Sequence, residues 1–95
     1  MSYKLEFKAS AKKEWDKLDN SIRQQFKAKL AERLANPRIP TAKLHNMPDC
    51  YKIKLRQSGY RLIYQVEDER ITIIVLAVGR RDKSEAYEKA KSRLA

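Results

Sequence analysis

The segment ITIIVLAV, residues 71–78, constrains the fold more than any other part of the chain, because it is almost continuously apolar. A strand of this composition is typical of the centre of a sheet that is covered on both faces. With 95 residues the chain is long enough for one modest hydrophobic core and too short for two. We therefore predict a single domain, residues 1–95, that contains this segment as a central strand.

Three other segments have the pattern of half-buried strands. Residues 3–7, 51–55 and 60–66 alternate apolar and polar side chains, which is the period of a strand with one face in the core. The prolines of residues 37–49 indicate an irregular connection, with a short edge strand around residues 43–44. The strands should therefore form a small antiparallel sheet.

Helical spacing appears in two segments between the first two strands. Ala11, Trp15 and Leu18 lie on one helix face, so we interpret Trp15 as a core residue. Residues 22–34 then carry an apolar side chain at every fourth position. Residues 84–94 have the composition of a further short helix. The predicted class is α+β: a two-helix hairpin packed on a small antiparallel sheet, with a short C-terminal helix.

The composition indicates an anionic partner. Lys and Arg number 22 against 12 Asp and Glu, which gives a formal net charge of +10. So strong a positive field on a small surface favours nucleic acid. No apolar run approaches the roughly 18 residues of a membrane span, and residues 1–4 do not begin a signal peptide. We therefore expect a cytoplasmic protein with no membrane partner.

Metal and nucleotide cofactors are not expected. Cys50 is the single cysteine, and we interpret it as a small core residue. The histidine and cysteine residues have no metal-ligand spacing, so no metal site is predicted. Gly59 and Gly79 are the only glycines, so the sequence has no glycine-rich phosphate loop.

The predicted strand pair 51–55 and 60–66 has one strongly basic face. If Ser58 and Gly59 form the hairpin tip, Arg56 lies directly opposite Arg61 and the apolar side chains share the other face. Like charges placed opposite each other destabilise a sheet, so this arrangement favours an anion-binding face over a merely solvated one. The residues on this face are Lys52, Lys54, Arg56, Arg61 and Gln65.

Two runs carry a resemblance to a known family. MPDCYKIKLRQSGYRLIYQV, residues 47–66, followed by VGRRDKSEAY, residues 78–87, closely resembles the RelE toxins of bacterial RelBE toxin–antitoxin systems. The likeness includes KKEWDKL at residues 12–18 and ANPRI at residues 35–39, and it extends over essentially the whole chain. It implies the RelE fold, which is microbial-ribonuclease-like.

The resemblance also implies an activity and its partners. A RelE toxin is a ribosome-dependent endoribonuclease that cuts the mRNA codon in the ribosomal A site and stops translation. The implied partners are the ribosome, with its 16S rRNA and A-site mRNA, and a RelB-type antitoxin that wraps the toxin. Operator DNA would be bound only through the antitoxin complex. Carried over residue by residue, the catalytic set is Lys52, Lys54, Arg61, Arg81 and Tyr87.

These residue types suit RNA cleavage by the RNA's own 2′-hydroxyl, which needs a base, charge stabilisation at the phosphorane and a proton for the leaving oxygen. Arg61 and Arg81 are permanently charged and suit transition-state stabilisation. Lys52 and Lys54 stand about 7 Å apart on one strand face, and crowding among cations lowers a lysine pKa. We hypothesise that Lys54 is the base or proton relay and Lys52 the phosphorane stabiliser, with the reverse assignment left open. Tyr87 would stack on a base, or else pack in the core.

Further basic residues are candidates for RNA or ribosome binding without a role in the chemistry. A solvated helix face is the alternative for the four in the second helix, and His45, the only histidine, is alternatively a plain surface residue. The candidates are Arg56, Arg80, His45, Arg23, Lys27, Lys29 and Arg33. A second function also stays open, namely a non-catalytic basic module that binds ribosomal RNA or another nucleic acid.

Overall fold

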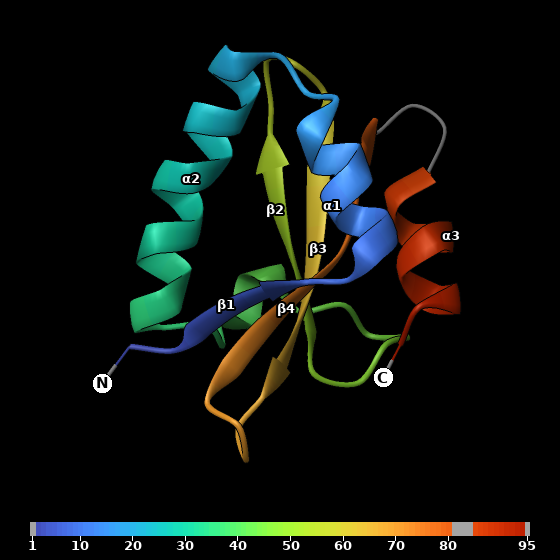
Figure 1. The fold of residues 1–95 in the computed structure, drawn as a ribbon. Coiled ribbons are helices and arrows are strands. Elements are labelled where there is room, and N and C mark those ends of the chain that lie inside the picture. Colours follow the sequence, from blue (N-terminus) through green and yellow to red (C-terminus); the bar gives the residue numbers. More distant parts are fainter. Residues whose placement is uncertain (1, 81–84, 95) are drawn as a thin grey trace.

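The computed structural model describes residues 2–80 and 85–94 (Figure 1). Apart from the short edge strand expected around residues 43–44, each predicted strand and helix is present within one or two residues of its expected bounds. In chain order the elements are β1 (Lys4–Phe7), α1 (Ala9–Asp16), α2 (Asn20–Ala35), the 3-10 helix η1 (Pro40–Ala42), β2 (Cys50–Leu55), β3 (Tyr60–Glu67), β4 (Thr72–Arg80) and α3 (Glu85–Ser92).

The four strands form one sheet in the order β1-β4-β3-β2, which confirms the α+β class. The pairs β2–β3 and β3–β4 are antiparallel, as predicted. β1, however, pairs with β4 in parallel, so the sheet is mixed. The direction of β1 depends on how the two helices return the chain to the sheet, and local alternation carries no information about that return. β4 lies inside the sheet and is buried from Thr72 to Gly79, as its apolar sequence predicts.

A first core fills the space between the sheet and the helices α1 and α2. Trp15 and Phe26 pack there against Tyr64, and all three side chains are buried. The Phe7 and Trp15 rings meet edge to face with their centroids 5.2 Å apart, a favourable aromatic geometry. The prediction that Trp15 is a core residue is therefore confirmed.

A second core lies on the opposite face of the sheet, beneath α3 and the loop around Leu44 and Met47. Ala86 and Ala90 of α3 are fully buried in it. Cys50 is also fully buried, as predicted, and burial raises the pKa of its thiol to about 12. The sheet face that carries Lys52, Lys54 and Arg61 is therefore polar at one end only, because the rest of it is buried in this second core.

The β2–β3 hairpin differs from the predicted register. Lys54 pairs with Arg61 and Leu55 with Tyr60, so residues 56–59 form a four-residue turn and Arg56 lies in it. Gly59 closes the turn at φ +77°, and its N–H donates to the Leu55 carbonyl at 2.9 Å. A shift of two residues keeps every side chain on its predicted face, so alternation alone cannot distinguish the two registers.

Residues 36–49 are irregular, as expected, except for the short 3-10 helix η1, which the sequence did not indicate. The predicted edge strand around residues 43–44 is reduced to one isolated antiparallel bridge between Lys43 and Tyr51. Within residues 2–80 and 85–94, none of the helices combines the length and apolarity needed to cross a bilayer.

Candidate functional site

Lys52, Lys54 and Arg61 occupy one end of the β2–β3 ribbon and share one face of it. Lys54 and Arg61 are direct cross-strand partners, and Lys52 lies one step along the same face, opposite Ile63. The sequence therefore predicted the correct cluster, although it placed Arg56 and not Lys54 opposite Arg61. This arrangement keeps like charges adjacent, which is unfavourable until an anion binds.

The pKa of Lys54 is lowered by the other cations of the cluster. Its side chain is exposed, and the neighbouring charge of Lys52, followed by that of Arg61, lowers its pKa. Arg56 in the turn adds a smaller effect of the same sign. A lysine with a lowered pKa gives up its proton more readily, which is the property required of a general base.

Tyr87 of α3 lies directly against Arg61. The Arg61 Nη1 donates to the Tyr87 hydroxyl at 2.5 Å, and the Arg61 guanidinium carbon lies 5.0 Å from the centroid of the Tyr87 ring. The Arg61 Nε is buried and has no hydrogen-bond partner among the described residues. An unsatisfied buried donor costs about 1–3 kcal/mol, so the Arg61 Nε is an unfavourable feature of the free protein.

Arg80 ends β4 next to this cluster, since Arg61 pairs with Gly79 and Tyr60 with Arg80. The exposed Arg80 guanidinium lies 5.6 Å from the centroid of the Tyr60 ring. Arg81, the fifth member of the predicted catalytic set, lies outside the described residues.

A basic hollow of about 330 Å³ continues the cluster around the edge strand β2. Arg33 of α2 is held there by donating to the Lys52 carbonyl at 3.1 Å and to the Tyr64 hydroxyl at 2.9 Å. Its described lining includes no acidic side chain, so Lys29 and Arg33 of α2 form one continuous basic surface with the cations of β2 and its turn. The lining residues are Lys29, Arg33, Thr41, Ala42, Lys52, Lys54 and Arg56.

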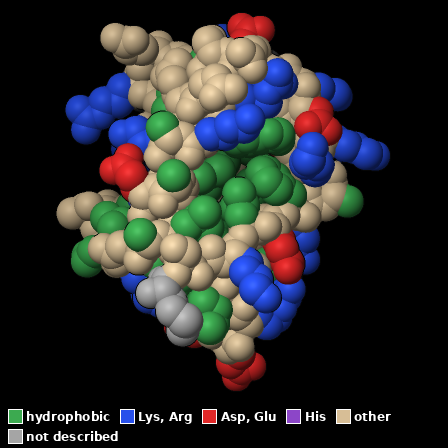
Figure 2. Space-filling model, turned by 60° about the vertical axis from the view of Figure 1, so that its left-hand side comes forward, with side chains coloured by type: hydrophobic (Ala, Val, Ile, Leu, Met, Phe, Trp, Pro, Cys, Tyr) green, Lys and Arg blue, Asp and Glu red, His purple; other side chains and the backbone are tan. Residues whose placement is uncertain are grey.

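The other two α2 candidates have different surroundings. Arg23 donates to the Leu18 carbonyl at 2.6 Å and to the Asp16 carbonyl at 3.2 Å, which satisfies the C-terminal end of α1. Lys27 lines an apolar groove of about 240 Å³ between β1 and α2, together with Leu5, Phe7, Trp15, Leu30, Ala31 and Leu34. Figure 2 shows hydrophobic side chains gathered in a hollow with Lys and Arg side chains at its margin. Such an apolar surface suits a protein partner better than RNA.

His45 and Asn46 lie beside Tyr87, a neighbourhood that the sequence did not indicate. They line a hollow of about 230 Å³ between the loop and α3, and Leu44 and Met47 contribute its apolar part. Glu88 and Lys91 complete it from the helix. The loop is therefore placed to contact the same ligand as Tyr87.

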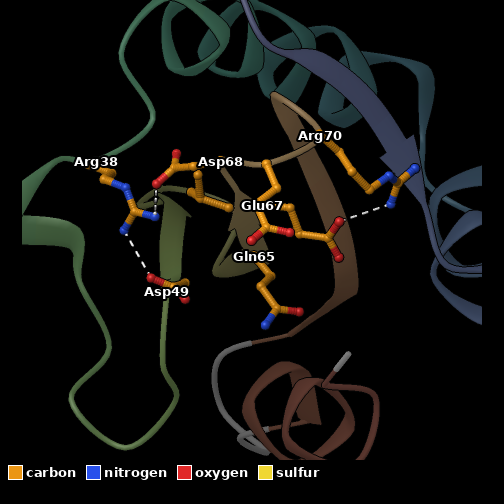
Figure 3. A pocket seen from close by; sticks show the side chains of 8 residues that line it. Arg38, Asp49, Gln65, Glu67, Asp68 and Arg70 are labelled. Carbon is orange, nitrogen blue, oxygen red and sulfur yellow. Dashed lines mark hydrogen bonds and ion pairs between the residues drawn. The ribbon is translucent and has the colours of Figure 1, made fainter.

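A further hollow, of about 520 Å³, lies at the other end of β3 and carries no comparable chemistry (Figure 3). Arg38 bridges Asp49 and Asp68 at 3.0 and 2.8 Å, and Arg70 contacts Glu67 at 2.9 Å. These cations are already paired with carboxylates, so the network joins loops and offers no free positive charge to an anion. The described residues contain no group of three or more His, Cys, Asp or Glu side chains that would hold a metal ion.

Comparison with known proteins first defines the class of the protein, a toxin of a type II toxin–antitoxin system. Residues 5–85 match a family described as the ParE toxin of the type II toxin–antitoxin system parDE. Solved structures agree: a double-arginine mutant of the Escherichia coli toxin RelE in the free state has a TM-score of 0.93 at 53% identity, with 100% of both chains covered. The toxin of the intact E. coli RelBE toxin–antitoxin complex gives 0.82 at 56% identity, covering 83% of this chain and 96% of that one.

Sequence comparison then specifies the member. The chain is 54% identical over 94 residues to the mRNA interferase toxin RelE of E. coli strain K12, with 99% of each chain covered. An mRNA interferase RelE from Shigella flexneri matches to the same extent. The protein therefore belongs to the RelE toxins of the ParE and RelE superfamily, which confirms the resemblance found in the sequence.

Proposed function

We propose that the protein is a ribosome-dependent endoribonuclease that cleaves mRNA in the ribosomal A site and is neutralised by a RelB-type antitoxin. The observation that carries this proposal is the cluster of Lys52, Lys54 and Arg61 beneath Tyr87, where cations converge without a described acid between them. Relatives at 54% identity are named mRNA interferases, and a solved complex pairs RelE with RelB. Both the ribosome and its mRNA are cytoplasmic, so the protein acts in the cytoplasm.

In the proposed reaction the 2′-hydroxyl attacks the adjacent phosphate, and the 5′-oxygen of the next nucleotide leaves. Lys54 accepts the 2′-hydroxyl proton, since the neighbouring cations lower its pKa, and as a proton relay it returns that proton to the leaving 5′-oxygen. Lys52 and Arg61 stabilise the charge of the phosphorane, together with Arg81. Tyr87 aligns the scissile nucleotide by stacking on a base. A phosphate oxygen of the substrate accepts the hydrogen bond that the Arg61 Nη1 donates to the Tyr87 hydroxyl in the free protein.

The remaining cations position the RNA. Lys29, Arg33 and Arg56 surround the basic hollow next to the lysines, and Arg80 extends the surface beyond β4. Contacts from such residues to phosphates carry affinity but no sequence information. His45 contributes from its loop beside Tyr87, whereas Arg23 and Lys27 serve at most as outlying contacts to ribosomal RNA. Operator DNA is bound only through the antitoxin complex.

The direct test is incubation of the protein with programmed ribosomes, followed by mapping of the mRNA ends. A cut in the A-site codon with a new 5′-hydroxyl end is the expected result, because attack by the 2′-hydroxyl leaves that oxygen on the downstream fragment. Binding to ribosomes with intact mRNA would instead establish the rival function, a non-catalytic basic module.

The pH dependence of cleavage should identify the base. A lysine base is active when neutral, so the single-turnover rate should rise with pH until it levels off at a pKa below the ordinary lysine value, as the lowered pKa of Lys54 requires. Lys54→Arg is permanently charged and should be slow at every pH, with this rise abolished. The matched control Lys52→Arg should keep the rise; if it loses the rise while Lys54→Arg retains it, the two roles are reversed.

The antitoxin should act on α3 as well as cover the basic surface. α3 buries little apolar surface of its own beyond Ala86 and Ala90, and so short a helix is marginal without tertiary contacts. A partner helix with larger apolar residues can displace it and move Tyr87 away from Arg61. Hydrogen exchange of residues 85–94 should then become faster in the antitoxin complex. Unchanged or slower exchange would mean that the antitoxin only occludes the site.

A further inference from the structure

One edge of β4 loses its strand partner next to the proposed site. β1 ends at Phe7, opposite Val75, and the Lys8 N–H makes the next contact to the Val75 carbonyl at 3.0 Å. On the other side, Tyr64 pairs with Val75 and Ile63 with Ala77, so Leu76 is the extra residue of a β-bulge. β3 remains paired with β4 up to Arg80, but the β4 backbone groups beyond Val75 that face the β1 side need partners from outside the sheet.

Two side chains supply these partners. The Val78 N–H donates to the Glu14 Oε1 at 3.1 Å, and the Arg93 Nη1 donates to the Leu76 carbonyl at 2.9 Å. Arg93 and Glu14 also pair with each other through both oxygens, at 3.0 Å for Nη1 to Oε1 and 3.1 Å for Nη2 to Oε2. A carboxylate and a guanidinium thus close the free edge of β4 from α1 and from the residue after α3.

Glu14 also pairs with a second cation, Lys89 of α3, whose Nζ lies 3.0 Å from the Glu14 Oε2. The side chains of Glu14 and Arg93 are only 17% and 20% exposed, so solvent screens their attraction weakly. Burial opposes the charge of Glu14, but the hydrogen bonds from Arg93, Val78 and Lys89 outweigh it and hold its pKa below the usual value. This ion pair is therefore a built connection between α1, β4 and the C-terminal end of α3.

The connection matters because α3 has few other attachments. Its fully buried side chains are the small Ala86 and Ala90, and Tyr87 and Leu94 are only partly buried. Tyr87 lies six residues before Arg93, or about 9 Å along a helix axis. If the Arg93 end of α3 is free to tilt, the Tyr87 ring will move out of contact with Arg61.

We propose that Glu14 is a positioning residue for the cleavage reaction: by holding Lys89 and Arg93 it fixes α3 on the sheet and so sets Tyr87 against Arg61. This inference rests on the proposed ribonuclease function and names a residue that the sequence did not single out. Glu14 itself touches no substrate, because its oxygens are occupied by β4 and by the two cations.

The test uses Glu14→Gln, which keeps the side-chain volume but cannot accept from the whole Arg93 fork. The single-turnover rate on saturating programmed ribosomes should fall about 10- to 100-fold, the cost of a small misplacement of an aligning group, while ribosome affinity stays unchanged. In a Tyr87→Ala background the same substitution should cost nothing further. Asp16→Asn is the matched control, because Asp16 lies on the same helix and pairs with the exposed Lys12 at 2.6 Å.

A second variant, Arg93→Gln, removes the charge that pairs with Glu14 from the C-terminal end of α3 and leaves the Glu14 contact with Val78 in place. It should show the same loss and the same lack of additivity with Tyr87→Ala. Equal losses with and without Tyr87, or wild-type cleavage by a folded Glu14→Gln protein, would overturn the inference. Hydrogen exchange in the absence of ribosomes tests the structural role of Glu14 separately from the cleavage activity. Faster exchange confined to residues 85–94 in Glu14→Gln supports the connection even if the wild-type protein proves not to cleave mRNA.

Discussion

Replacing Arg61 by glutamine should slow mRNA cleavage by about 10²–10³-fold, the usual cost of removing one donor that stabilises a developing oxyanion. Arg61 presents a permanent charge next to the proposed base Lys54, and its Nε has no partner among the described residues. Among the described residues its side chain hydrogen-bonds to Tyr87 and to no core residue, so its loss should leave the sheet and both cores intact. The measurement is the single-turnover rate on programmed ribosomes, accompanied by a thermal unfolding scan.

Arg56→Gln is the matched control for this substitution. Arg56 is an exposed arginine in the adjacent turn, and it lies beyond the end of the β2–β3 ladder. It should weaken ribosome binding with little effect on the rate at saturation. A folded Arg61→Gln protein that cleaves at the wild-type rate would remove Arg61 from the site. Arg81→Ala is expected to cripple cleavage for the same electrostatic reason, a prediction that rests on the sequence alone.

Ribosome affinity should depend steeply on salt. Each phosphate neutralised by a lysine or arginine releases condensed counterions, so a protein with 6–10 such contacts loses about 10³–10⁵ in affinity between about 50 and 200 mM salt. The protein has a net charge of +10, and the cations around the basic hollow and the β2–β3 face are concentrated on one continuous surface. The measurement is the dissociation constant of the ribosome complex across a salt series.

Variants locate the surface that is responsible. Lys29→Gln removes one cation from the basic hollow and should reduce the slope of log affinity against log salt by about one. Arg70→Gln is the control, since Arg70 is already paired with Glu6 and Glu67 at the other end of the sheet. The double variant Arg23→Glu with Lys27→Glu tests the outer face of α2 separately. An affinity that barely changes with salt would show that the basic surface is not the docking surface.

The cluster of Lys52, Lys54 and Arg61 illustrates how far sequence reasoning extends in this protein. A period of two assigns each side chain to a face of the strand, and a slip of one residue would bury charges in the core. The cluster was therefore predictable from the alternation of residues 51–66 alone. The actual pairing of Lys54 with Arg61 was not, because a slip of two residues preserves the faces and the choice depends on turn geometry.

The sequence by itself determined the α+β class, the four main strands and the three α-helices, the burial of Trp15 and Cys50, and the membership of the basic face, because each follows from local periodicity or composition. Only the tertiary structure decided the parallel pairing of β1 with β4, the second core beneath α3, and the convergence of Arg33 with the lysines of β2. It alone placed Tyr87 against Arg61 and Glu14 against Arg93. These contacts join residues that are distant in the chain. Their geometry depends on how all the elements pack together, and a local sequence pattern contains no information about that packing.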